Sequence, residues 1–199
     1  MDADDSTHPL YPESQEIIMV YVILADGFEE IEALTPVDVL RRAGIEVTTV
    51  GISGKTATGA HGIRVECDVT ADGAGDISKA EALVFPGGMP GASNIDGYPE
   101  TDGWIASVLA GGGYVAAICA SPMILGKRGY LAGRSAVCFP GFEEYLVGAS
   151  VVKGADAVRD GKFITSRCMG TAFPFALEIV EALRGREVRD ATEKAVLAL

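Results

Sequence analysis

Cys119 is the residue whose surroundings most clearly indicate chemistry. It ends an apolar run over residues 114–118, and two small residues, Ala117 and Ser121, stand two positions before and after it. This spacing is typical of a nucleophile elbow, a tight strand-to-helix turn that leaves room only for small neighbours. A cysteine at the start of a helix also meets free amides and the positive end of the dipole, which favour a thiolate. We therefore predict a reactive thiol of low pKa.

The partner of this thiol is predicted to be a carboxyl group, because the chain has only two histidines, His8 and His61. Glu29, Glu30 and Glu32 open a predicted helix, where carboxylates also suit the helix dipole. A carboxyl group that faces a thiolate has its pKa raised by burial and by the like charge, so it can hold or transfer a proton. Helical spacing places Glu29 and Glu32 on one face and Glu30 on another. The residues alone do not decide which glutamate faces the thiol.

A second motif, Pro86-Gly87-Gly88, follows a short apolar run. Glycines directly after a core strand allow backbone N–H groups to point into a site and to bind an oxyanion. A tight turn explains the same three residues equally well. The chain has no glycine-rich nucleotide fingerprint and no Walker lysine pattern, so we expect no nucleotide cofactor.

The other cysteines, Cys67, Cys138 and Cys168, are spaced irregularly. Cys67 alternates with valines and is predicted to pack in the interior, whereas Cys138 and Cys168 follow strand-like segments and are candidates to face the site. We expect no metal site, because the spacing fits none of the usual ligand patterns and histidines are scarce.

Alternating strands and helices are predicted to position these motifs. Strands are expected over residues 17–24, 45–52, 82–85, 114–118, 135–138, 150–159 and 163–166, and an edge hairpin over 55–69. Helices are expected over 29–43 (with a kink or restart at Pro36), 101–110, 122–128, 171–183 and 187–198. This order predicts an α/β fold with a mostly parallel sheet and helices on both faces. Ligands bind such sheets at the carboxyl ends of the strands, where the three motifs can converge.

Composition limits the classes of partner. The 199 residues are 48% hydrophobic, which suits one domain over residues 17–199 preceded by a flexible acidic tail over 1–16. The formal net charge of −12 argues against nucleic-acid binding. The longest apolar run is too short to span a membrane. Four cysteines without a C-x-x-C motif, and no apparent signal peptide, predict a cytoplasmic protein.

Over residues 20–191 the chain resembles the DJ-1/ThiJ branch of the PfpI-like superfamily. The motifs that carry the resemblance are Ala25-Asp26-Gly27-Phe28-Glu29-Glu30-Ile31-Glu32, Pro36-Val37-Asp38-Val39-Leu40, Pro86-Gly87-Gly88, Ala116-Ala117-Ile118-Cys119-Ala120 and Thr165-Ser166-Arg167. The resemblance implies a flavodoxin-like three-layer sandwich that forms a homodimer. It also implies that Cys119 is the nucleophile, that Glu32 is hydrogen-bonded to it, and that the amides of Gly88 and Ala120, beside Gly87, form the oxyanion site.

The activity implied by this resemblance is a cofactor-independent, metal-independent glyoxalase or deglycase, which converts small 2-oxoaldehydes such as methylglyoxal to hydroxy acids. The alternative is a redox-sensing stress protein with chaperone-like activity through oxidation of Cys119. The chain departs from the family pattern at two places. Phe139 stands where human-like members carry a histidine, and Cys168-Met169 replaces the usual Gly-Pro. The second departure makes Cys168 a candidate redox partner of Cys119.

Overall fold

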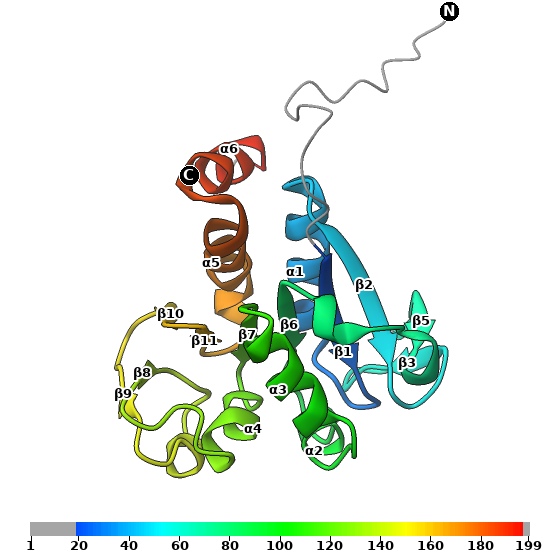
Figure 1. Cartoon of the computed structure of the whole chain (residues 1–199), viewed down its shortest axis with the longest axis horizontal. Coiled ribbons are helices and arrows are strands. Elements are labelled where there is room, and N and C mark those ends of the chain that lie inside the picture. Colours follow the sequence, from blue (N-terminus) through cyan, green and yellow to red (C-terminus); the bar gives the residue numbers. More distant parts are fainter. Residues whose placement is uncertain (1–18, 197–199) are drawn as a thin grey trace, which may run out of the picture.

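The computed structural model describes residues 19–196 (Figure 1). Its strands are β1 (Met19–Leu24), β2 (Glu46–Gly51), β3 (Thr56–Thr58), β4 (Arg64–Glu66), β5 (Val69–Thr70), β6 (Ala82–Phe85), β7 (Tyr114–Ile118), β8 (Ser135–Ala136), β9 (Ser150–Val151), β10 (Ala157–Asp160) and β11 (Phe163–Ser166). Its α-helices are α1 (Glu30–Arg42), α2 (Gly91–Asp96), α3 (Thr101–Ala110), α4 (Pro122–Lys127), α5 (Ala172–Arg184) and α6 (Arg186–Ala195). Short 3-10 turns are η1 (Ala71–Gly73), η2 (Ile77–Lys79), η3 (Glu143–Tyr145) and η4 (Met169–Thr171). The acidic tail expected over residues 1–16 lies outside the described residues.

A seven-stranded sheet with the order β10-β11-β7-β6-β1-β2-β5 organises the molecule. Each neighbouring pair is parallel except β10 and β11, which are antiparallel. Parallel strands need cover on both faces, and the central strand β6 is buried along its whole length. The expected mostly parallel sheet is confirmed.

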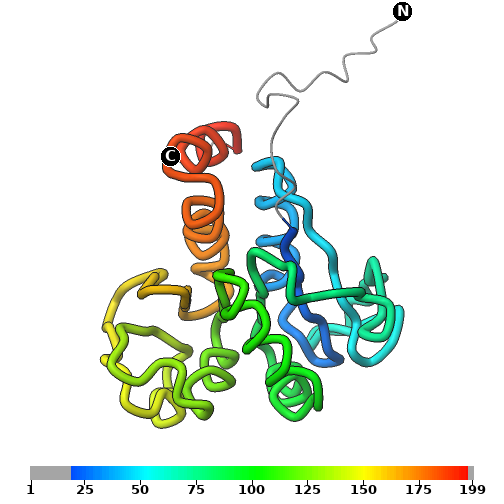
Figure 2. The backbone as a smooth tube through the Cα atoms, viewed as in Figure 1, coloured from blue at the N-terminus to red at the C-terminus, as the bar shows by residue number. Residues whose placement is uncertain are grey.

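The two faces of the sheet carry two separate hydrophobic clusters, as alternation along β1 shows. Val20 and Val22 pack with residues of α1 and α5, whereas Tyr21 and Ile23 pack with residues of α3 and α4. Side chains of a strand alternate between faces, so one apolar strand supplies both clusters. The chain therefore has the flavodoxin-like three-layer α/β fold. In Figure 2, α5 and α6 (orange to red) stand beside α1 (blue), and α1 packs directly against α5.

Several expected elements differ in detail. The hairpin over residues 55–69 forms its own two-stranded sheet from β3 and β4, and only β5 joins the edge of the main sheet. The strand expected over 150–159 is divided into β9 and β10, because Gly154 between them has a φ of +80°. Helix α1 continues through Pro36, which is buried, so no restart occurs. Helix α2 has no counterpart in the expected elements.

Candidate active site

The carboxyl ends of four adjacent strands, β11, β7, β6 and β1, meet at one edge of the sheet. The segments that follow them contain Cys168, Cys119, Gly87 and the glutamates at the start of α1. The expected convergence of the three motifs is therefore found, at the edge where parallel α/β sheets bind ligands.

Cys119 occupies a strained turn directly after β7. It is the one described residue other than glycine with a positive φ, at 66°. This conformation costs on the order of 1–3 kcal/mol and must be held by its surroundings. The Cys119 N–H donates to the carbonyl of Ser166 at 2.9 Å, and the Cys119 carbonyl accepts from the N–H of Phe139 at 2.8 Å. The buried Ser121 hydroxyl donates to the Pro86 carbonyl at 2.6 Å. The expected tight turn with a small residue at position 121 is confirmed.

Glu32 is the glutamate that faces this thiol, and its side chain is almost fully buried, with 1% of the residue exposed. Its carboxylate accepts hydrogen bonds from the Gly87 N–H at 3.0 Å, from the Met169 N–H and from the Cys119 thiol. Burial, together with the negative charge of Glu29, raises the pKa of Glu32 to about 7, although these hydrogen bonds oppose the rise. A buried carboxyl group that titrates near neutral pH is suited to acid–base chemistry.

The low pKa expected for the Cys119 thiol is wrong when Glu32 is ionised. Burial, followed by the charge and the hydrogen bond of Glu32, raises the pKa of the Cys119 thiol to about 12, whereas the amides of Gly88 and Ala120 lower it. Helix α4, which was expected to supply a favourable dipole, is only six residues long and starts three positions later. Two of the three effects that raise this pKa vanish when Glu32 carries the proton. The thiol and the carboxyl group therefore share one proton, and the thiolate forms when that proton lies on Glu32.

The amides of Gly87 and Gly88 were both expected to bind an oxyanion, but in the structure they have different roles. The Gly87 N–H is directed to Glu32, so this amide positions the carboxylate rather than binding an oxyanion. A Cβ atom at Gly87 would lie 2.5 Å from both the Cβ of Cys119 and the Oε2 of Glu32, so only glycine fits. The amides of Gly88 and Ala120 are hydrogen-bonded to the Cys119 sulfur, where they are available to an oxyanion formed on the adjacent atom.

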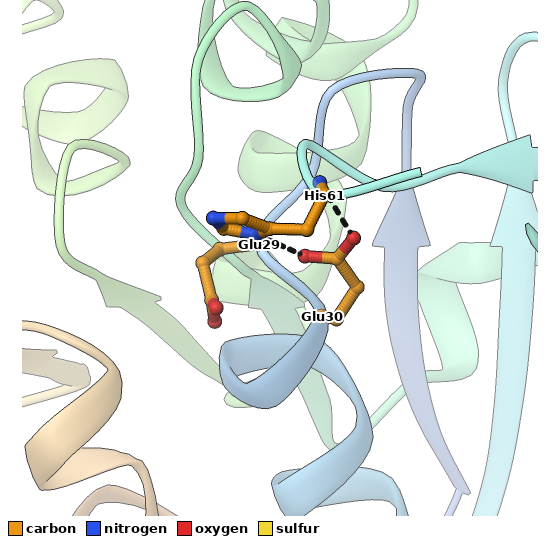
Figure 3. A group of neighbouring side chains, drawn as sticks. All are labelled: Glu29, Glu30 and His61. Carbon is orange, nitrogen blue, oxygen red and sulfur yellow. Dashed lines mark hydrogen bonds and ion pairs between the residues drawn. The ribbon is translucent and has the colours of Figure 1, made fainter. Parts of the chain in front are cut away.

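The three glutamates at the start of α1 have three separate roles, and two of them, Glu29 and Glu30, are drawn with His61 in Figure 3. Glu29 caps the helix, because its side chain accepts the Glu32 N–H at 2.7 Å. Glu30 turns to the β3–β4 hairpin and accepts from the backbone N–H and the Nδ1 of His61, each at 2.8 Å. Glu32 faces Cys119. The residues alone left this assignment open, and the structure agrees with the one implied by the family resemblance.

Glu29, Glu30 and His61 also form the one group among the described residues that has the spacing of a metal site. One ligand atom from each lies within 4.8 Å of the others. The Glu30–His61 hydrogen bonds and the capping bond of Glu29 account for this arrangement by themselves.

The Glu30–His61 pair gives a directly measurable prediction. The hydrogen bond and the charge of Glu30 raise the pKa of His61 above its usual 6.5. We expect an NMR titration of the His61 ring to give a midpoint above that value, and Glu30→Gln to lower it. The stabilisation from the protonated ring should be complete below the unfolded-state pKa and should be lost as pH rises through the folded-state pKa. A midpoint at or below 6.5 in the wild type would contradict this pairing.

The remaining cysteines occupy distinct places. Cys67 and Cys138 are buried in the two hydrophobic clusters, as expected for Cys67. Cys168 is partly buried and directly precedes η4, where its sulfur accepts the N–H of Thr171. The N–H of Met169, a residue that the sequence analysis did not place in the site, is bonded to Glu32. In the sequence, the only indication that this loop belongs to the site was the replacement of the usual Gly-Pro by Cys168-Met169.

The fold, and the position of Cys119 and Glu32 in it, indicate the family to which the chain belongs. Residues 19–182 match the model of the DJ-1/PfpI family, so the chain belongs to this family. The sequence is 40% identical over 179 residues to protein dj-1beta of Drosophila melanogaster, covering 88% of this chain and 95% of the relative. The crystal structure of that Drosophila protein superimposes with a TM-score of 0.85 at 36% identity, over 92% of this chain and 98% of that chain.

Two relatives are named for activities. A glutathione-independent glyoxalase of Caenorhabditis elegans is 34% identical over 161 residues, covering 80% of this chain and 84% of the relative. A deglycase of Pyrococcus horikoshii is 30% identical over 166 residues, covering 83% of this chain and 99% of the relative. These similarities support a glyoxalase-type or DJ-1-type stress role. Among residues 19–196, no helix is long and apolar enough to cross a membrane.

Proposed function

We propose that this protein is a cofactor-independent glyoxalase that converts small 2-oxoaldehydes, such as methylglyoxal, to hydroxy acids. The observation that carries the proposal is the contact between the partly buried Cys119 and the buried Glu32, in which Glu32 has a pKa near 7 and two backbone amides bind the thiol sulfur. A nucleophile, a proton carrier and oxyanion donors are the three groups that this reaction needs.

In the proposed reaction, the Cys119 thiolate attacks the aldehyde carbon and forms a hemithioacetal. The amides of Gly88 and Ala120 stabilise the oxyanion that develops on the former aldehyde oxygen. Glu32, which carries the shared proton while Cys119 is a thiolate, donates that proton to this oxyanion and becomes a carboxylate. The carboxylate then removes the proton from this carbon and returns it to the neighbouring carbon, while the hydroxyl proton of the hemithioacetal passes to the ketone oxygen, so that the ketone becomes an alcohol and the hemithioacetal becomes a thioester. Water hydrolyses the thioester, releasing lactate and restoring the thiol. Glu32 suits the proton transfer because its pKa lies near neutral pH.

The experiment that tests this function is incubation of the purified protein with methylglyoxal in the absence of glutathione and added metal, followed by quantification of lactate. Lactate formed by the wild type and lost in both Cys119→Ser and Glu32→Gln supports the proposal. Absence of lactate from folded, reduced wild-type protein refutes it.

A redox-sensing role is the second candidate, and the position of Cys168 favours it. Ser166, two residues before Cys168, accepts the N–H of Cys119, and the amide that follows Cys168 is bonded to Glu32. The segments that carry Cys119 and Cys168 therefore lie side by side, after the paired strands β7 and β11, and both contact Glu32. Peroxide would oxidise Cys119 to a sulfenic acid with release of water, and Cys168 would then displace a second water to form a disulfide.

We expect mild peroxide treatment of the wild type to lower the intact mass by about 2 Da, because a disulfide forms. Cys168→Ser should instead gain about 32 Da on the Cys119 peptide, because a sulfenic acid without a resolving thiol proceeds to the sulfinic acid. Intact-mass and peptide-mass measurements distinguish these products. Oxidation of Cys67 or Cys138 with Cys119 unmodified would eliminate the sensor hypothesis.

We also propose that the protein is a homodimer that uses the outer face of α1. A groove of about 660 Å³ lies on this face. Three of the exposed large hydrophobic side chains, Ile31, Leu34 and Ile63, line it. The exposed ion pair of Asp38 and Arg42 also lines it, and polar groups of this kind surround apolar interface centres.

Leu34→Glu is expected to convert the dimer to a monomer, because the substitution would bury an unpaired charge between the two copies. Light scattering coupled to size-exclusion chromatography measures the change in mass. Val147→Glu provides the control, since Val147 is also an exposed apolar residue but does not line the groove. A monomeric wild type, or a dimer unaffected by Leu34→Glu, would show that this face is not the interface.

We further propose that residues 17–199 form a single cytoplasmic domain that has neither nucleic acid nor membrane as a partner. The four free cysteines are consistent with a reducing compartment. The formal charge of −12 disfavours contact with phosphate backbones.

A further inference from the structure

Three exposed apolar residues belong to the loops whose backbone contacts the reactive pair. Among the described residues, eight large hydrophobic side chains are exposed, and three of these are Met89, Phe139 and Met169, with exposed fractions of 50%, 42% and 52%. We call these three residues the apolar rim.

The backbone ties each member of the apolar rim to the site. Met89 directly follows Gly88, whose amide is bonded to the Cys119 sulfur. The N–H of Phe139 donates to the Cys119 carbonyl at 2.8 Å. The N–H of Met169 is bonded to the carboxylate of Glu32. A molecule that reacts with Cys119 therefore approaches beside three different loops, each of which carries one exposed apolar side chain.

The chemistry of the apolar rim favours one kind of substituent. Methionine is flexible and polarizable, so it adapts to ligands of different shape and contacts aromatic rings well. Phe139 is supported by an edge-on contact with Phe142, with ring centroids 6.4 Å apart and an interplanar angle of 78°. No rim side chain is charged, and the carboxylates of Glu29 and Glu30 lie at the start of the same helix as Glu32. Anionic electrophiles are therefore disfavoured.

We infer that the apolar rim selects neutral electrophiles that carry an aromatic or branched apolar substituent for reaction with Cys119. If the protein has the proposed function, the inference predicts that substituted 2-oxoaldehydes are preferred over methylglyoxal as substrates. This part of the inference rests on the proposed function. The reaction is the same internal transfer: the aldehyde carbon becomes a carboxylate, the ketone becomes an alcohol, and one water is consumed. Phenylglyoxal would therefore give mandelate.

The first test compares initial rates with phenylglyoxal and with methylglyoxal. We expect kcat/KM to be at least about tenfold higher for phenylglyoxal, which is the discrimination that a few buried methylene equivalents provide. Met89→Gln combined with Met169→Gln should lower this ratio, because glutamine has a similar length but a polar end. The matched control is Met89→Leu combined with Met169→Leu, which keeps the apolar surface and should keep the ratio. An unchanged ratio in the glutamine variant would overturn the inference.

The second test does not depend on turnover. Alkylation of Cys119 by N-phenylmaleimide and by N-ethylmaleimide is followed by peptide mass. The ratio of the two rates is then divided by the same ratio for glutathione, which corrects for the intrinsic reactivity of the two reagents. We expect the phenyl-to-ethyl rate ratio, normalised to glutathione, to be clearly above one in the wild type and lower in the glutamine variant. This result supports selection by the apolar rim even if no hydroxy acid is formed and the proposed function fails. A normalised ratio of one overturns the inference, even if methylglyoxal is converted.

Discussion

Cys119→Ser is expected to lower kcat/KM for methylglyoxal by at least about a thousandfold while leaving the fold intact, because a serine hydroxyl in this site lacks a base strong enough to ionise it. The proton shared by Cys119 and Glu32 reaches the carboxyl group only because a thiol is far more acidic than an alcohol. Serine is close in size to cysteine and fits the same turn at a φ of 66°. The loss should therefore be one of chemistry rather than of packing.

Lactate formation under saturating and limiting methylglyoxal measures this effect, with circular dichroism as the test of folding. Cys168→Ser is the matched control. It makes the same substitution at the other partly buried thiol, and a serine hydroxyl can replace the sulfur that accepts the Thr171 N–H. We expect the control to turn over methylglyoxal at a rate close to that of the wild type. Equal losses in the two variants would mean that Cys119 is not the nucleophile.

Glu32→Gln is expected to lower kcat by about a hundredfold or more, because glutamine keeps one acceptor oxygen in the same place but cannot carry a proton between the two carbons. Its side-chain oxygen can still accept from the Gly87 N–H, which donates to Glu32 at 3.0 Å in the wild type. The variant therefore separates proton transfer from positioning. Glu32→Asp retains the carboxyl group but shortens the side chain, so partial activity there would support the proton-carrier role.

The pH dependence provides a second measurement on the same variant. In the wild type, the pair should lose its first proton near pH 7, so the rate should rise through that pH as the one-proton, reactive state becomes populated. Glu32→Gln should lack this rise. The pKa of the Cys119 thiol should also fall well below about 12, since the charge of Glu32 no longer opposes the thiolate. Thiolate absorbance reports this pKa, and a thiol pKa unchanged by Glu32→Gln would disprove the coupling.

The raised pKa of Glu32 also links stability to pH. The folded state binds this proton more tightly than the unfolded state, because the pKa rises from 4.5 to about 7 on folding. The stabilisation is fully present below pH 4.5 and is lost as pH rises through about 7. Denaturant titrations at pH 4.5 and pH 8 should therefore show that wild type loses stability relative to Glu32→Gln between these two conditions. An unchanged difference would mean that folding does not raise the pKa of Glu32.

The sequence allowed the architecture and the tight turn at Cys119 to be predicted, because both depend on local patterns. Strand–helix alternation predicts the parallel sheet, and the small residues around Cys119 predict the turn in which it lies. The assignment of the three glutamates was different. Glu29, Glu30 and Glu32 all suit a helix N-terminus by residue type, and their separate roles depend on partners that are distant in sequence, such as Gly87 and His61.

The expected low thiol pKa was wrong for a similar reason. The prediction used the position of Cys119 before a helix, which is visible in the sequence, but the actual pKa depends on burial and on the distance to Glu32. The contribution of the Met169 amide was missed because a backbone group has no signature in residue type. The division of the strand over 150–159 depends on Gly154, whose left-handed conformation is decided by the loop rather than by the local apolar pattern.

Gly87 allows Cys119 and Glu32 to approach each other, because it has no side chain to occupy the space between them. Any larger residue would push the sulfur and the carboxyl group apart, since its Cβ would lie 2.5 Å from the Cβ of Cys119 and from the Oε2 of Glu32. A related chain with both reactive residues but alanine at this position would therefore have the parts of an enzyme without their coupling. In classifying uncharacterised relatives, the glycine should be weighed together with the cysteine and the glutamate, and its replacement would mark a pseudoenzyme.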